Sequence, residues 1–115
     1  MEENVIYSLS KQFALRIVKL YSILLERNEY VMSKQLYRSG TSIGANIAES
    51  LFAQSNADYL NKLKIALKEA SESKYWIELL SESGYLKEDE SLSLMNDVKT
   101  IIGTLVNIIN KLNNK

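Results

Sequence analysis

Apolar residues recur at steps of three and four along four long stretches of this 115-residue chain. That spacing places them on one face of an α-helix, whereas a half-buried strand would alternate at every second residue. The clearest stripe runs through Leu94, Val98, Ile101, Leu105 and Ile108. The chain has no proline and only 4 glycines, so little interrupts long helices. We therefore predict an all-α protein.

Local signals mark the ends of the predicted helices. Ser33 is expected to cap the second helix and Ser55 or Asn56 the third, and Met32 is expected to pack onto Tyr37. Gly84 is expected to end the third helix in the left-handed conformation, with Tyr85 folding back onto Leu80. Long helices joined by short loops predict one domain, an antiparallel up-down-up-down four-helix bundle spanning residues 1–115. The helices are expected at about residues 4–27, 33–53, 56–83 and 88–112.

The residue types present limit the chemistry available to the chain. It contains no Cys and no His, which excludes disulfides, thiolate nucleophiles, imidazole bases and nearly every transition-metal site. Adjacent acids such as Glu69 and Glu72 could serve as general acid and base only beside a nucleophile or electrophile, and the sequence pattern places none with them. We therefore predict no enzymatic activity, no catalytic or metal-binding residue, no cofactor and no small-molecule substrate.

Fourteen basic residues balance fourteen acidic ones, so the formal net charge is zero. Such a chain has no global field to draw it onto nucleic acid or an anionic membrane. The first residues are acidic rather than basic, unlike a secretory signal. The longest uncharged stretches are shorter than the roughly 20 residues that span a bilayer. A cytoplasmic protein without a membrane partner is expected.

The second predicted helix carries small residues at an unusual spacing. Gly40, Gly44 and Ala48 recur every four residues, and each glycine costs about 1 kcal/mol in a helix interior. Close packing of a neighbouring helix is the simplest reason for them. Contact of the exposed backbone with a ligand or partner is the alternative.

A polar row flanks those small residues. Arg38 and Glu49 lie three turns apart, too far to pair within the helix, so each is expected to contact another helix, another subunit or water. The simplest interpretation is structural, with Asn46 hydrogen-bonding a neighbouring backbone. The row consists of Arg38, Ser42, Asn46 and Glu49.

Two helices carry more apolar surface than one bundle needs. On the third helix, apolar side chains including a tryptophan lie away from the core stripe, and on the fourth they widen the apolar arc. A subunit interface accounts for both. The alternatives are a Trp76 ring lying over a bundle end and a fourth helix set deeply between its neighbours. The predicted interface residues are Ile65, Trp76, Leu79, Ile102, Val106 and Ile109.

Basic residues on the first and third helices are the candidates for contact with nucleic acid. They are scattered without interleaved aromatics, which is typical of a solvated face. In an oligomer, however, a modest basic spot is repeated in every subunit, and multivalency strengthens weak contacts. Any RNA binding is therefore expected to be weak and independent of sequence. The candidates are Arg16, Lys19, Lys62, Lys64 and Lys68.

The segment from Arg38 to Glu49, RSGTSIGANIAE, resembles the signature of the 23S rRNA intervening-sequence protein family. Similar matches follow in order at residues 65–70 (IALKEA), 75–80 (YWIELL) and 84–86 (GYL). The resemblance implies a four-helix bundle that assembles as a five-fold ring. It also implies RNA or a reverse transcriptase as candidate partners, as for the related accessory proteins of diversity-generating retroelements. After Glu49 this chain has Ser50 and Leu51, where many relatives have a glycine and a basic residue.

Together these features predict a non-enzymatic, homo-oligomeric scaffold or interaction protein, a pentamer by resemblance. The alternative is an RNA-binding accessory protein that uses a repeated basic rim and partners a reverse transcriptase.

Overall fold

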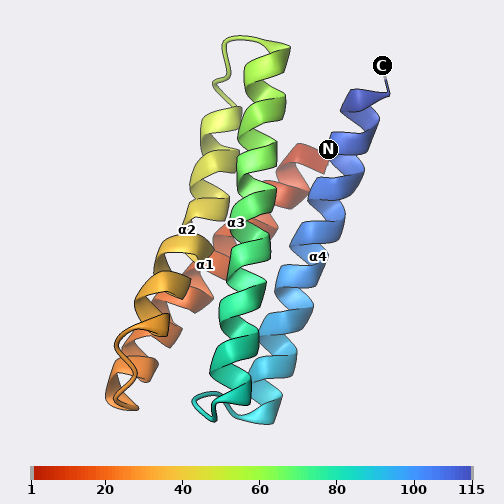
Figure 1. Ribbon diagram of the computed structural model, residues 1–115. Coiled ribbons are helices and arrows are strands. Elements are labelled where there is room, and N and C mark those ends of the chain that lie inside the picture. The colour runs from red at the N-terminus through yellow and green to blue at the C-terminus, as the bar shows by residue number, and fades with distance from the viewer. Residues whose placement is uncertain (1, 115) are drawn as a thin grey trace.

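The computed structural model describes the backbone of residues 2–114 and the side chains of residues 4–114. Four helices run alternately up and down, as Figure 1 shows. This architecture confirms the predicted all-α antiparallel four-helix bundle. The helices are α1 (Glu2–Glu26), α2 (Met32–Ser50), α3 (Asn56–Glu82) and α4 (Glu88–Asn113).

The helices pack in chain order around an elongated body of 46 × 21 × 19 Å. Each helix contacts the one before and after it, and α1 closes the bundle against α4. α1 therefore lies diagonally opposite α3. The α1–α4 contact is the least extensive of the four, and the seam between these two helices contains two hollows, one lined by Leu20 and Leu94 and the other by Phe13 and Ile101.

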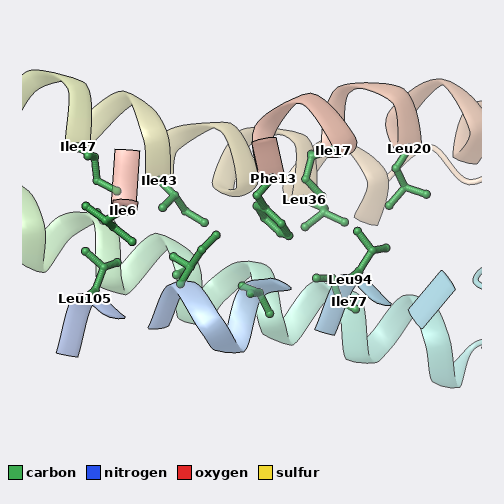
Figure 2. Close-up of a cluster of buried hydrophobic side chains, with 14 of the residues drawn as sticks. Ile6, Phe13, Ile17, Leu20, Leu36, Ile43, Ile47, Ile77, Leu94 and Leu105 are labelled. Carbon is green, nitrogen blue, oxygen red and sulfur yellow. The ribbon is translucent and has the colours of Figure 1, made fainter. Parts of the chain in front are cut away.

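The core is a column of side chains contributed by all four helices (Figure 2). Phe13, Leu36, Ile77 and Leu94 each expose 3% of their surface or less. All four belong to the three- and four-residue stripes of their helices, which is why that spacing predicted the fold. Leaving water stabilises each such side chain by roughly 1.5–3 kcal/mol.

The turn between α1 and α2 differs from the prediction. Asn28 has a positive φ of 66°, and the N–H of Glu29 donates to Leu24 O at 2.9 Å, which closes α1 with a Schellman motif. Glu29 is thereby turned back, and its carboxylate accepts the N–H groups of residues 31–33. Ser33 as the N-cap of α2 was therefore wrong. A buried glutamate caps the helix instead.

Glu29 is only 5% exposed, yet its pKa lies below the usual value for a glutamate. Burial raises the pKa of Glu29, but the backbone N–H groups of Ser33, Met32 and Val31 together lower it further than burial raises it. At the same end of the molecule, Tyr37 packs against Tyr21 of α1, with ring centroids 4.9 Å apart and the ring planes inclined at 57°.

The caps of α3 were predicted correctly. The N–H of Asp58 donates to Ser55 Oγ at 3.0 Å. Gly84 has a φ of 88°, and the N–H of Tyr85 donates to Leu80 O at 2.9 Å. The helix before it was predicted too long: α2 ends at Ser50 rather than near residue 53, and a tight turn follows.

An ion pair holds the ends of α1 and α4 together. Two nitrogens of the Arg27 guanidinium donate to the two carboxylate oxygens of Glu90, at 2.9 and 3.0 Å. Arg27 also donates to Tyr85 O at 2.8 Å. Glu90 accepts the N–H of Lys87 as well. The hydrogen bond from Arg27, followed by that from Lys87, lowers the pKa of Glu90 to about 2.

By length and composition, α4 is the one described helix that could cross a membrane. Its main apolar stripe packs into the core of the bundle, and the core helix of a soluble protein has the same composition.

Candidate interaction surfaces

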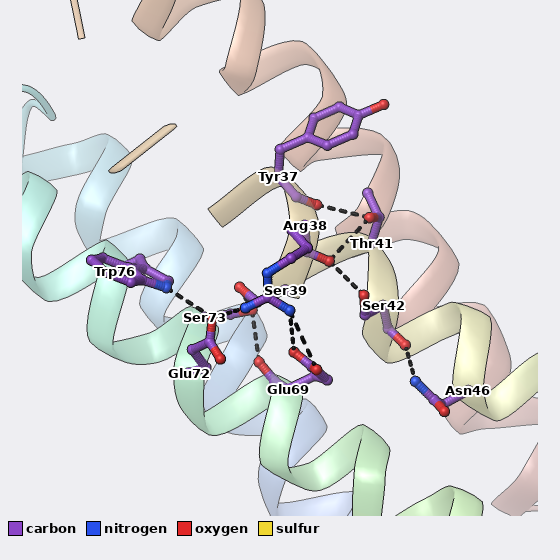
Figure 3. Close-up of polar contacts among 10 residues, drawn as sticks. All are labelled: Tyr37, Arg38, Ser39, Thr41, Ser42, Asn46, Glu69, Glu72, Ser73 and Trp76. Atoms are coloured by element: carbon purple, nitrogen blue, oxygen red, sulfur yellow. Dashed lines mark hydrogen bonds and ion pairs between the residues drawn. The ribbon is translucent and has the colours of Figure 1, made fainter. Parts of the chain in front are cut away.

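Arg38 on α2 contacts two carboxylates on α3, as Figure 3 shows. Its guanidinium lies 3.3 Å from Glu69 Oε2 and pairs with Glu72. The indole N–H of Trp76 donates to Glu72 at 3.1 Å. This bond, and then the pairing with Arg38, lower the pKa of Glu72 against the opposing effect of burial. The cluster joins α2 to α3 within one chain.

Beneath this cluster, the buried hydroxyls of Ser39 and Ser73 are hydrogen-bonded at 2.9 Å between α2 and α3. Ser42 and Asn46 bond within their own helix: Ser42 Oγ donates to Arg38 O, and Asn46 Nδ2 donates to Ser42 O at 2.9 Å. Their polar groups therefore find partners inside the chain, which favours the structural interpretation of this row.

Glu49, at the other end of the row, also pairs with α3. Its Oε1 lies 3.0 Å from Lys62 Nζ, and the hydrogen bond and charge of Glu49 raise the pKa of Lys62. Arg38 and Glu49 thus both contact another helix of the same chain. The ends of the row hold α2 against α3.

The glycines of α2 face α1. A Cβ at Gly40 would lie 2.9 Å from Ile17 Cγ1, closer than real Cβ atoms approach other atoms. At Gly44 the nearest atom would be Ser10 Oγ at 3.5 Å, an ordinary contact. Close packing therefore explains Gly40, whereas Gly44 has room for a methyl group.

A second apolar row follows α4 beside its core stripe, and we call it the outer α4 stripe. It consists of Leu92, Met95, Ile102 and Val106, whose spacing is that of a coiled-coil seam with Lys99 at the missing step. Leu92 is 64% exposed and Val106 37%, whereas Met95 and Ile102 are half-buried. In one copy of the chain, this stripe is only partly covered.

The six predicted interface residues lie in three different settings. Ile65, Trp76 and Leu79 are half-buried on α3, and Trp76 is bonded into the Arg38 cluster on the side of α2. Ile102 and Val106 belong to the outer α4 stripe. Ile109 is 7% exposed and already part of the core, so it has little surface to offer a partner.

The five basic candidates do not form one patch. Arg16 and Lys19 are on α1, whereas Lys62, Lys64 and Lys68 are on the diagonally opposite α3. Arg16 pairs with Asp97 at 2.5 Å, and Lys62 pairs with Glu49. Lys19, Lys64 and Lys68 are exposed.

Some exposed apolar residues were not singled out from the sequence. Leu15 and Val18 on α1 are 58% and 44% exposed, and Phe52, just after α2, is 86% exposed. Helical spacing places Leu15 and Val18 off the core stripe of α1, so that signal was present. Phe52 was assigned to a helix that ends before it.

Within the described residues, no cluster of three acidic side chains could hold a metal ion.

Comparison with known proteins gives one family and a close structural match. The model of the 23S rRNA-intervening sequence protein family matches residues 2–107. A crystal structure of a protein of unknown function from the S23 ribosomal protein family of Bacteroides thetaiotaomicron superposes with a TM-score of 0.94 and 52% sequence identity. The match covers 96% of this chain and 99% of that one. No curated protein matches the sequence.

Proposed function

Because the chain belongs to the 23S rRNA-intervening sequence protein family, whose function is unknown, we propose a role from its surface: it is a non-enzymatic scaffold that acts by assembling with copies of itself. The outer α4 stripe carries this proposal. Its spacing suits a helix-to-helix contact, and Leu92 and Val106 leave apolar surface in water that a second copy would cover.

The distribution of the predicted interface residues suggests an assembly in which each copy uses two surfaces. Trp76 is on α3 and bonds Glu72 of the Arg38 cluster, whereas Val106 belongs to the outer stripe of α4. A subunit that presents one surface to one neighbour and a different surface to the next forms a ring when the rotation closes. The five-fold ring implied by the resemblance is of this kind.

Val106→Glu tests the proposal. A carboxylate within an apolar contact must either lose its water or separate the subunits. Val106 is exposed in the single chain, so the fold should tolerate the change. We expect circular dichroism to show unchanged helicity and light scattering to show a lower mass than that of the wild type.

Leu15→Glu is the matched control, since Leu15 is an exposed apolar residue on α1, away from the stripe. It should leave the mass unchanged. If Val106→Glu keeps the mass of the wild-type assembly, the outer α4 stripe is not the contact. Trp76→Glu gives a less direct test, because its carboxylate would lie beside Glu72 and disturb the Arg38 cluster.

A further inference from the structure

Phe52 is the most exposed large apolar side chain in the described part of the molecule, at 86%. It lies in the turn between α2 and α3, beside Leu51, which is 50% exposed. The turn is firmly held: the N–H of Phe52 donates to Glu49 O at 3.1 Å, and that of Ala53 donates to Ser50 O at 3.2 Å. An aromatic ring displayed on an ordered turn loses little freedom on binding, which suits an anchor.

Phe52 protrudes from the surface, whereas the seam between α1 and α4 contains a hollow. It has a volume of about 190 Å³ and is lined by the apolar residues Leu20, Ile23 and Leu94. Arg16, Lys19 and Glu90 complete the lining. Leu20 and Leu94 are buried, but Ile23 is 38% exposed, so the hollow is apolar and open to solvent.

Phe52 cannot fill the hollow of its own chain. The hollow lies near the end of α1 and the start of α4, whereas the α2–α3 turn is at the other end of the bundle (Figure 1). The 19 residues of α2 alone separate these ends by roughly 30 Å. Only another molecule can place a ring there.

We propose that Phe52 of one copy docks in the α1–α4 hollow of a second copy. Charge supports this choice of partner. Glu49, one turn before Phe52, pairs with Lys62 of its own chain but keeps 59% of its side chain exposed, and Lys19, one turn before Ile23, is exposed at the hollow. A docked turn would therefore bring a partly exposed carboxylate toward an ammonium group of opposite charge. The inference rests on the proposed self-association and adds a head-to-tail contact to it, since turn and hollow are different surfaces.

The absence of Cys from the chain allows a direct test by cross-linking. Leu51→Cys, which keeps the Phe52 ring beside it, and Ile23→Cys are prepared as separate proteins, mixed and mildly oxidised. A disulfide requires the two Cα atoms to come within about 7 Å, so it forms quickly only where the positions meet. Val31→Cys replaces Leu51→Cys in the control mixture, since Val31 is 72% exposed and lies at the other end of α2.

We expect the 51–23 disulfide to form at least about tenfold faster than the 31–23 disulfide, because docking of Phe52 raises the local concentration of the two thiols. Equal rates would overturn the inference, as would a product dominated by 51–51 disulfides, which would mean that turn meets turn. The mass of the wild-type protein distinguishes failure of the docking from failure of the self-association. An assembled wild type without the 51–23 product rejects only the docking, whereas a monomeric wild type rejects both.

Discussion

Gly40 has no room for a side chain, because a Cβ there would lie within 3.1 Å of both Cγ atoms of Ile17. Both atoms are attached to a branched Cβ that is itself 3.4 Å away, so they cannot move aside cheaply. Gly40→Ala should therefore lower the free energy of unfolding by about 1–2 kcal/mol, since overpacking exceeds the gain in helix propensity. Urea denaturation measures this change.

Gly103 is the matched control. It also lies inside a helix, but nothing is found within 4 Å of the position a Cβ would take. Gly103→Ala should raise the free energy of unfolding by about 0.5–1 kcal/mol. Equal effects at the two positions would show that close packing is not the reason for Gly40.

Glu29 makes a second residue-scale prediction. Its carboxylate accepts three backbone N–H groups at the start of α2, and it is buried. In Glu29→Gln, the amide NH₂ would face donors, and one acceptor oxygen would be lost. We expect a loss of about 1–3 kcal/mol in thermal or urea unfolding. Glu26→Gln, at an exposed position, should change stability by less than about 0.5 kcal/mol; a comparable loss there would argue against capping by Glu29.

At the scale of the elements, the sequence predicted both ends of α3 but not the cap at the start of α2. Ser55 and Gly84 act on residues within a few positions, so their roles were readable from the sequence. Glu29 caps α2 only because Asn28 turns the chain back, and serine seemed the better cap by type. The core stripes were predictable for a similar reason, since helical spacing alone determines which side chains share a face.

The Arg27–Glu90 pair joins two elements and makes stability depend on pH. The pKa of Glu90 falls from 4.5 to about 2 on folding, so its contribution is present above about pH 4.5. That contribution, at most about 3 kcal/mol, is lost as pH falls toward 2. Glu90→Gln should lower stability at pH 7 and flatten the wild-type decline between pH 4.5 and 2. A variant that kept the full wild-type pH dependence would exclude Glu90 as its source.

At the scale of the whole molecule, the sequence identified surfaces better than it identified their partners. It showed that Arg38 and Glu49 needed contacts outside their helix, but not that both contacts are on α3. It showed extra apolar surface on α3 and α4, but not that Trp76 faces α2 or that Ile109 is buried. Such facts depend on how neighbouring helices are rotated, which apolar spacing within one helix does not specify.

The central claim is that this bundle is a subunit, and native mass measures it most directly. Native mass spectrometry of the purified wild-type chain, over a range of concentrations and with absorbance recorded for nucleic acid, is the measurement. We predict a discrete assembly whose mass is a whole multiple of 13.1 kDa and which needs no nucleic acid to form. A particle of 13.1 kDa at every concentration, or one that assembles only with bound RNA, would contradict the account.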